Sequence, residues 1–347
     1  MTRRQLVSAA PMLIGVAKGQ AKFPVTGSGE HTYEIAHDWP RLPDKLAFGN
    51  THGIAVDSEN RLIVAHTVHK SSGSPDAIAI FDDKGKFVKS WGADMRGGAH
   101  GLILRREGSQ EFLYHCDNVK GFVRKTTLDG EVVWVMHAPV ASGLYNKASE
   151  YRPSNLAIAP NGDIYVADGY GKFYIHHFDS KLRWVRTFGG SREEMDRNKG
   201  KETARGTTIW PHAIAIDPRG KKPLLMVGER GENRRIQYFS LHGKPLHSVK
   251  EGVRWPSTFQ FRNGVLLMPD LKAVVTLFDS ANKPIVQLAD GQQADGKTYE
   301  GLRTQERSAF PAGRFIAPHD ACFDRDGNIF VAEWVEVGRV SKLRRVG

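Results

Sequence analysis

The stretch Pro-His-Ala-Ile-Ala-Ile-Asp at residues 211–217 recurs along the chain in five related forms. Each copy has a histidine or a serine at one anchor position, and these anchors are His52, His100, Ser154, His212, Ser257 and His319. Successive anchors are 48, 54, 58, 45 and 62 residues apart, a spacing that suits a four-stranded propeller blade with variable loops. The repeat therefore predicts six blades.

Short β-rich runs follow turn sequences within each repeat. Ile-Tyr-Val-Ala-Asp at 164–168, for example, follows the turn Ala-Pro-Asn-Gly-Asp at 159–163, and helical periodicity is nearly absent. The last repeat ends after three strands, so we expect residues 31–40 to supply its fourth strand and remove the open sheet edges. The sequence thus predicts an all-β, six-bladed β-propeller that forms one domain over residues 31–347, closed by an N-terminal strand in the last blade.

Composition agrees with a globular protein. The chain has 347 residues, of which 40% are hydrophobic and 25% charged, and its polar insertions at 190–207 and 290–312 are predicted to be surface loops. A formal charge of +11 permits attraction to anionic substrates or surfaces. No basic run with interleaved aromatic residues is present, so we do not expect a nucleic-acid partner.

Residues 1–22 join the pair Arg3 and Arg4 to an apolar stretch of roughly a dozen residues, too short to span a bilayer comfortably. This pattern indicates a twin-arginine export signal and a periplasmic or extracellular protein with no membrane span after signal removal; the alternative is an ordinary basic N-terminus. Cys116 and Cys322 have no metal-ligand spacing and are expected to be buried small hydrophobes, not a disulfide.

Three of the anchor histidines, His100, His212 and His319, occupy alternate repeats. The first strand of each blade lines the central channel, so these imidazoles are expected to converge about 120° apart. Three neutral imidazoles suit Zn²⁺ and leave a fourth position for water or substrate. The alternative is that they hydrogen-bond across a wet channel. His52 shares the register in the first blade and is interpreted as a channel or substrate-facing residue.

From about residue 50 onward the chain resembles peptidyl-α-hydroxyglycine amidating lyase, the lyase domain of peptidylglycine α-amidating enzymes and a six-bladed propeller of the NHL-repeat type. The motifs that carry this resemblance are Ala-His-Gly-Leu at 99–102, Val-Ala-Asp-Gly-Tyr-Gly at 166–171, Pro-His-Ala-Ile-Ala at 211–215, Glu-Arg-Gly-Glu-Asn-Arg-Arg-Ile-Gln-Tyr-Phe at 229–239 and Pro-His-Asp at 318–320. By this resemblance His100, His212 and His319 correspond to the family's catalytic zinc ligands.

The resemblance also implies a structural Ca²⁺ held by the backbone carbonyls of Ile54 and Leu102 and by the carboxylate of Asp320. It matches Tyr170 and Arg230 to a catalytic tyrosine and arginine, and we expect the arginine to lower the pKa of the phenol. The implied reaction is cleavage of the C–N bond of an α-hydroxylated, nitrogen-substituted small molecule or peptide C-terminus to an amide and a glyoxylate-like product.

One departure concerns recognition of the substrate carboxylate, because Thr67 stands where the family has a first-blade arginine. Lys70, His66 and His69 are the candidates to replace this arginine, and the residues expected to face the substrate are His52, His66, Thr67 and Lys70. Two alternatives to a lyase stay open: a noncatalytic NHL-type propeller that binds a protein or an anionic glycan, and, less favoured, a gluconolactonase-type hydrolase. Most second strands also end in a carboxylate, which indicates a structural role; these are Asp117, Asp168, Glu229, Asp270 and Glu333.

Overall fold

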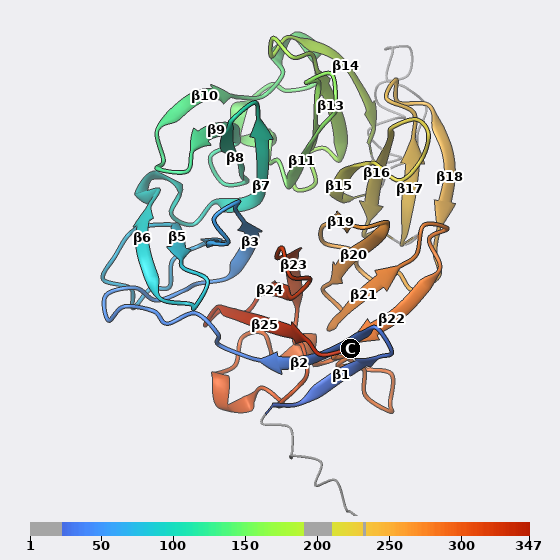
Figure 1. Ribbon diagram of the computed structural model, residues 1–347. Helices are drawn as coiled ribbons and strands as arrows, with labels where there is room; N and C mark the ends of the chain where they lie inside the picture. Colours follow the sequence, from blue (N-terminus) through green and yellow to red (C-terminus); the bar gives the residue numbers. More distant parts are fainter. Residues whose placement is uncertain (1–22, 191–209, 232–233) are drawn as a thin grey trace, which may run out of the picture.

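The computed structural model describes residues 23–190, 210–231 and 234–347. Six antiparallel sheets form a ring around a central channel (Figure 1), which confirms the predicted six-bladed β-propeller. The export signal predicted for residues 1–22 lies outside the described residues, and so does most of the loop predicted at 190–207. Among the described residues, no helix has the length and apolar character needed to cross a lipid bilayer.

Each of the first five blades takes four consecutive strands, with the first strand of each lining the channel. The first two blades contain β3 (Thr51–Val56), β4 (Leu62–His66), β5 (Ile78–Phe81) and β6 (Phe87–Trp91), and then β7 (Ala99–Glu107), β8 (Gln110–Asp117), β9 (Phe122–Thr127) and β10 (Val132–Met136). The third and fourth contain β11 (Asn155–Ile158), β12 (Ile164–Ala167), β13 (Tyr174–Phe178) and β14 (Trp184–Gly189), and then β15 (Pro211–Asp217), β16 (Leu224–Glu229), β17 (Arg235–Phe239) and β18 (Pro245–Val249). The fifth contains β19 (Gln260–Arg262), β20 (Val265–Asp270), β21 (Val274–Phe278) and β22 (Pro284–Leu288).

The last blade combines both ends of the described chain. It contains β23 (Pro318–Phe323), β24 (Ile329–Glu333), β25 (Arg339–Arg345), β2 (His31–Ala36) and β1 (Val25–Ser28), in that order from the channel outward. The pairing of β2 with β25 confirms the predicted ring closure. Strand β1 was not predicted; the Thr26 hydroxyl accepts a 2.7 Å hydrogen bond from the backbone N–H of Ala289 and so joins β1 to the end of the fifth blade.

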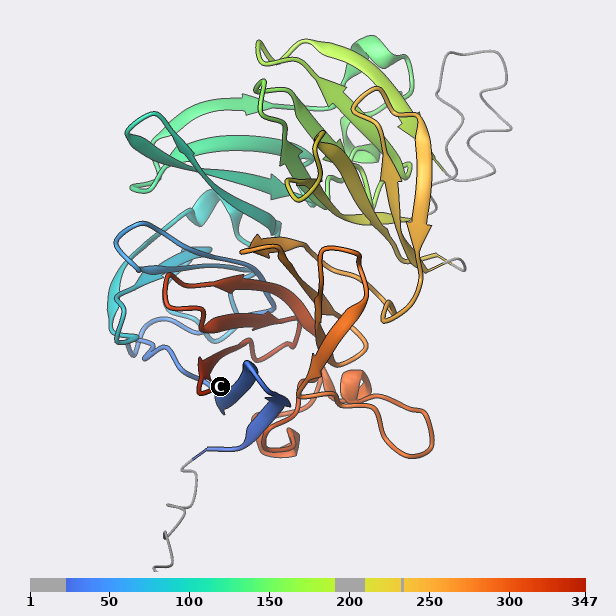
Figure 2. The same ribbon diagram turned by 45° about the vertical axis from the view of Figure 1, so that its right-hand side comes forward.

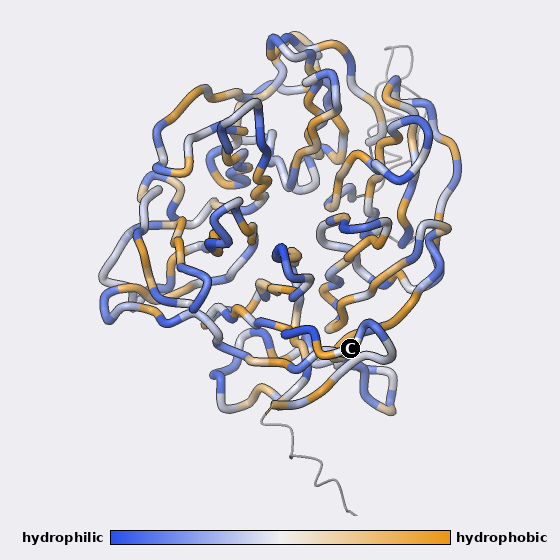
Figure 3. Tube along the Cα trace, in the orientation of Figure 1, coloured by the Kyte–Doolittle hydropathy of each residue, from blue (hydrophilic) through white to orange (hydrophobic). Residues whose placement is uncertain are grey.

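The hydrophobic core is divided among the contacts between neighbouring blades. Each of the six blade pairs encloses its own cluster of buried apolar side chains. Figure 3 shows apolar residues along the strands and hydrophilic residues in many of the turns that join them. Cys116 and Cys322 are free and fully buried within two of these clusters, as predicted.

Short 3-10 turns occur in the connections between blades. They are η1 (Ala93–Met95), η2 (Val140–Ser142), η3 (Ala148–Glu150), η4 (Tyr299–Leu302) and η5 (Arg307–Ala309). Both η4 and η5 belong to the 290–312 insertion, the orange segment that folds against the last blade (Figure 2). Its backbone joins this blade through a 2.9 Å hydrogen bond from the N–H of Glu336 to the carbonyl of Arg303. The predicted surface loop is thus anchored to the connection between β24 and β25.

Candidate metal centre

Four inner strands begin with a β-bulge, and each bulge contains a histidine. The pairing with the second strand shifts register between Thr51 and Gly53, Ala99 and Leu102, Pro211 and Ala213, and Pro318 and Asp320. A bulge adds one residue to a strand and redirects the side chain beside it. The bulge at His319 lets this histidine and the following aspartate both lie buried at the channel, which a regular strand with alternating faces would prevent.

Hydrogen bonds to the next blade fix the rings of three anchor histidines. The Nδ1 atoms of His100, His212 and His319 lie 2.7, 2.9 and 2.7 Å from backbone carbonyl oxygens, and these belong to Ser154, Ser257 and His52. Each acceptor is the anchor residue of the following blade, so one contact repeats three times around the ring. A carbonyl accepts only, so each Nδ1 carries the proton and each Nε2 keeps its lone pair.

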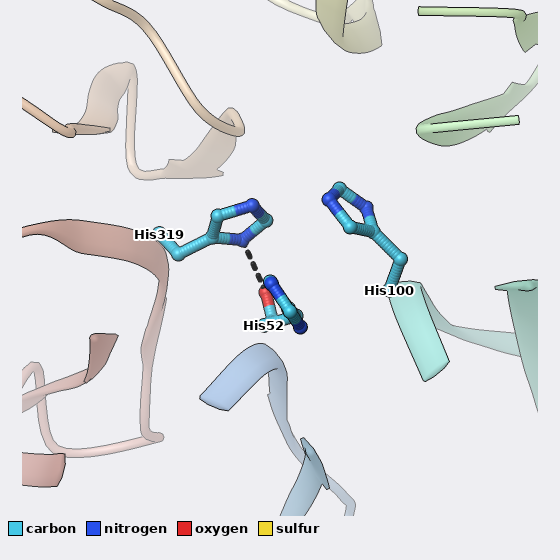
Figure 4. A group of neighbouring side chains, drawn as sticks. All are labelled: His52, His100 and His319. Carbon is cyan, nitrogen blue, oxygen red and sulfur yellow. Dashed lines mark hydrogen bonds between the residues drawn. The ribbon is translucent and has the colours of Figure 1, made fainter. Parts of the chain in front are cut away.

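His52 lies closer to this group than the threefold pattern predicts. Ring nitrogens of His52, His100 and His319 all lie within 4.8 Å of one another, an arrangement that could hold a metal ion (Figure 4). His212 is outside this compact group, although its ring centroid lies 5.0 Å from those of His100 and His319. The structure therefore brings four histidine rings together: the compact set is His52, His100 and His319, whereas the set predicted from the sequence has His212 in place of His52. The shared anchor register of His52 was the only sequence signal for its place here.

The four imidazoles are electrically neutral. Burial lowers the pKa of His52 to about 3 and holds the pKa values of His100, His212 and His319 well below the usual range. The nearby Arg230 guanidinium lowers all four further. Neutral imidazole is the form that binds metal ions, so the donor set is ready for a cation without first losing protons.

Tyr170 and Arg230 lie just beyond the second strands of the third and fourth blades, at one mouth of the channel. In every blade, a residue just after the second strand donates its backbone N–H to the carbonyl two positions before the anchor. These rim residues are Thr67, Asn118, Tyr170, Arg230, Leu271 and Trp334, and their N–H to oxygen distances run from 2.8 to 3.2 Å. The rim is therefore set by main-chain geometry, which puts side chains from different blades around the same opening.

The hydroxyl of Tyr170 lies between two of the histidines. It is 3.2 Å from Nε2 of His100 and 3.0 Å from Nε2 of His212, while Nε2 of His319 is buried and has no hydrogen-bond partner. One phenolic proton can serve only one of these three acceptors. Buried acceptors are normally satisfied, so the surplus of lone pairs fits a site for a cation.

Burial decides the direction of the Tyr170 pKa. Desolvation raises it above the usual range, and the charge of Arg230 and a hydrogen bond from its guanidinium lower it by less. Arg230 thus lowers the pKa of the phenol as expected, but the hydroxyl lies deep among the rings and burial outweighs this effect. Arg230 is itself buried: its Nε donates to the Pro256 carbonyl at 2.9 Å and its Nη2 to Ser257 Oγ at 2.8 Å.

The residues matched to a calcium site line a cavity of about 430 Å³ in the channel, which the inner strands enclose. Asp320 accepts hydrogen bonds there from Ile54 N–H at 2.9 Å, the Thr258 hydroxyl at 2.6 Å and its neighbour Ala321 N–H at 2.8 Å. Burial raises its pKa to about 7 in spite of these bonds. Leu102 is buried in the same lining, so the three matched residues lie together, with Ile54 facing the carboxylate through its N–H.

The other residues matched to substrate recognition have different surroundings. His66 is buried at the end of β4, where its Nδ1 accepts the Val68 N–H at 3.1 Å and burial lowers its pKa to about 3. Thr67 is partly exposed on the rim, and Lys70 is exposed beyond it. His69 is bonded locally, with Nδ1 2.7 Å from the Ser71 hydroxyl. None of these places a fixed positive charge at the rim.

The carboxylates that end most second strands hold backbone in place, as predicted. Asp270 accepts the N–H groups of Arg254 and Trp255, which lead into the anchor Ser257, at 2.7 and 2.6 Å. Glu333 does the same for the N–H of Ile316 at 2.7 Å and also forms a buried ion pair with Arg339. These acids therefore shape the rim and do not face the histidines.

Comparisons with known proteins agree with the resemblance seen in the motifs. No protein-family model matches the chain. It is 26% identical to a probable peptidyl-alpha-hydroxyglycine alpha-amidating lyase of Caenorhabditis elegans, over 94% of this chain and 92% of that protein. It is 25% identical to human NHL repeat-containing protein 3 over 60% of this chain, and 23% identical to mouse peptidyl-glycine alpha-amidating monooxygenase over 91%. The matched regions span 56% of that human protein and 32% of the mouse one.

Solved structures support the fold alone. Virginiamycin B lyase from Staphylococcus aureus has a TM-score of 0.58 at 14% identity and covers 90% of this chain and 100% of its own. A gluconolactonase from Xanthomonas campestris has a TM-score of 0.57 at 13% identity and covers 90% of this chain and 89% of its own. The chain is thus a propeller similar to NHL-repeat proteins and to amidating lyases.

Proposed function

We propose that this protein is a zinc-dependent lyase that cleaves the C–N bond of an α-hydroxylated, nitrogen-substituted substrate, of the peptidyl-α-hydroxyglycine kind. The observation that carries the proposal is the repeated Nδ1 contact, which leaves an Nε2 lone pair on each of the neighbouring buried rings of His100, His212 and His319. The Tyr170 hydroxyl lies beside two of these Nε2 atoms, those of His100 and His212. The similarity to proteins named amidating lyases supports the same reaction class.

We assign the zinc to His100, His212 and His319 because carbonyl partners orient ligand histidines and make them better donors. When bound there, the divalent ion supplies a Lewis acid for the substrate's α-hydroxyl oxygen. His52 lacks this pattern, because its Nδ1 is buried without a hydrogen-bond partner and its ring interacts with the backbone of Ala99, not with the carbonyl of the next anchor residue. In this assignment His52 faces the substrate.

Tyr170 acts as the general base in this proposal. It removes the proton of the α-hydroxyl, the carbon–oxygen double bond forms, and the C–N bond breaks with its electron pair going to nitrogen. The nitrogen takes up a proton, so the products are an amide and a glyoxylate-like aldehyde. The buried guanidinium of Arg230 stabilises the phenolate that exists before proton transfer, since its charge opposes the effect of burial on the Tyr170 pKa.

The direct test is to supply an N-acyl-α-hydroxyglycine to purified protein loaded with Zn²⁺ and to measure both the amide and glyoxylate. We expect the two products in equal amounts, at a rate that saturates with substrate. Metal-stripped protein is the control for the compound's spontaneous breakdown. Product formation no faster than in that control would refute the lyase and favour a propeller that only binds a protein or glycan.

We further propose that Asp320, with the Ile54 and Leu102 backbones, holds a structural Ca²⁺ in the channel. The pKa of Asp320, about 7, exceeds its ordinary value of 3.8, so without calcium its contribution to stability is full below about pH 4 and is lost as the pH rises through 7. Calcium requires the carboxylate and reverses this loss. We expect 1 mM Ca²⁺ to raise the melting temperature more at pH 8 than at pH 5.5.

The matched variants for this test are Asp320→Asn and Asp326→Asn, the latter in the exposed turn of the same blade. We expect the calcium effect to vanish in Asp320→Asn and to persist in Asp326→Asn. An equal effect in both would place any calcium elsewhere.

We also propose that residues 1–22 direct export through the twin-arginine route, which carries folded proteins and would suit a chain that acquires its metal first. The support is the Arg3–Arg4 pair before a short apolar stretch. Fractionation of cells that produce the full chain tests this location.

A further inference from the structure

The 290–312 insertion places an arginine against the channel rim. Arg303 follows η4, and its guanidinium carbon lies 3.6 Å from the ring centroid of Trp334. Its carbonyl accepts the N–H of Glu336, which belongs to the loop just beyond Trp334. A guanidinium stacked on an indole is held in orientation while its N–H groups, which lie in its plane, stay available.

Trp334 is the rim residue of the last blade. It therefore occupies the position that Tyr170 has in the third blade and Arg230 in the fourth. The last blade adjoins the first, whose rim residue is Thr67. Arg303 therefore lies at the rim of the last blade, next to the first blade, in which Thr67 stands in place of the expected arginine.

The guanidinium of Arg303 forms no ion pair among residues 23–190, 210–231 and 234–347, and its Nε is buried without a hydrogen-bond acceptor. The charges of Glu300 and Glu336 act on it without direct pairing, and Glu300 is paired with Lys272. Two other arginines that pack around the last blade are paired: Arg307 with Asp38 and Arg339 with Glu333. An arginine that is partly desolvated, oriented and unpaired is typical of a binding site for an anion.

We propose that Arg303 binds the substrate's carboxylate and so replaces, from a different blade, the arginine absent at position 67. The inference rests on the proposed function for the identity of its ligand, an N-acylated α-hydroxyglycine. A planar guanidinium can donate two parallel hydrogen bonds to a carboxylate, which the exposed ammonium of Lys70 cannot do. Arg303 thereby sets specificity for a free carboxyl terminus over a blocked one.

The test measures binding and needs no turnover. The probes are N-benzoylglycine, which carries the carboxylate but lacks the α-hydroxyl, and N-benzoylglycinamide, in which the carboxylate is blocked. Isothermal titration compares zinc-loaded wild type with Arg303→Gln, Arg303→Lys and the control Arg325→Gln. Arg325 is an exposed arginine in the β23–β24 turn, at the opposite end of the same blade.

We expect wild type and Arg325→Gln to prefer the carboxylate, and Arg303→Gln to bind it roughly 10- to 100-fold more weakly with little change for the carboxamide. Arg303→Lys, which keeps the charge over Trp334, serves if the glutamine variant does not fold, and should recover only part of the preference. Equal carboxylate binding in wild type and both Arg303 variants, or a wild type that does not distinguish the two probes, overturns the inference.

Turnover separates this inference from the proposed reaction. Arg303-dependent binding of N-benzoylglycine without cleavage of the α-hydroxylated compound would refute the lyase and leave the carboxylate site standing. Cleavage that is unaffected by Arg303→Gln would leave the lyase standing and refute the carboxylate site.

Discussion

Replacement of His212 by alanine is expected to remove the bound zinc, whereas replacement of His52 by alanine is expected to retain it. The two variants separate the two possible sets of three histidines, because His100 and His319 belong to both. His212 has its Nδ1–H fixed by the Ser257 carbonyl and its Nε2 directed at the Tyr170 hydroxyl, while His52 has no such fixed partner on Nδ1. A ligand held in orientation binds a metal ion with less loss of conformational freedom.

Elemental analysis of the purified chains measures this directly. We expect about one zinc per chain in wild type and in His52→Ala, and almost none in His212→Ala, His100→Ala or His319→Ala. Turnover should fall by about 10³-fold or more in the three variants without metal, since a Lewis acid supplies several kcal/mol of stabilisation to the transition state. Zinc retained in His212→Ala and lost in His52→Ala would assign the ion to the compact group of His52, His100 and His319.

The repeat made most of the fold predictable. Equivalent phrases at six anchors predict six blades, because each unit must bury its apolar faces against its neighbours. The closing strand followed from the missing fourth strand of the last repeat. Strand β1 escaped prediction because Val-Thr-Gly-Ser at 25–28 is mostly exposed, and it joins the fold through its pairing with β2 and the Thr26 contact.

For the site, the sequence predicted only which residues share the anchor position of the repeats. Shared anchor positions place histidines on one channel, but the bulge at each strand start decides where each ring points, and no local pattern reveals a bulge. That is why His52 came closer to His100 and His319 than expected. Arg303 lies in an insertion outside the repeat, so no repeat position could predict that it reaches the rim. The Tyr170 pKa depends on burial depth, which residue types alone do not supply.

Substitution of Tyr170 by phenylalanine is expected to lower kcat by about 10²- to 10⁴-fold while leaving zinc content near that of wild type. The change removes only the hydroxyl that lies near Nε2 of His100 and His212, so the imidazoles and their carbonyl partners stay in place. Rate, zinc content and melting temperature are measured on the same preparation. A rate within a few-fold of wild type would show that another group removes the proton.

The pH dependence of kcat in Arg230→Gln and Arg230→Lys is an independent test of Tyr170 as the general base. Burial raises the Tyr170 pKa and the charge of Arg230 lowers it, so loss of that charge must raise it further. If the phenolate is the active form, the rising limb of the profile should move to higher pH in Arg230→Gln and move less in Arg230→Lys, which keeps a positive charge near the phenol. A limb that stays in place in Arg230→Gln, or moves to lower pH, would mean that the limb reports a different group, and Tyr170 would then be retained only as a hydrogen-bond donor to His212.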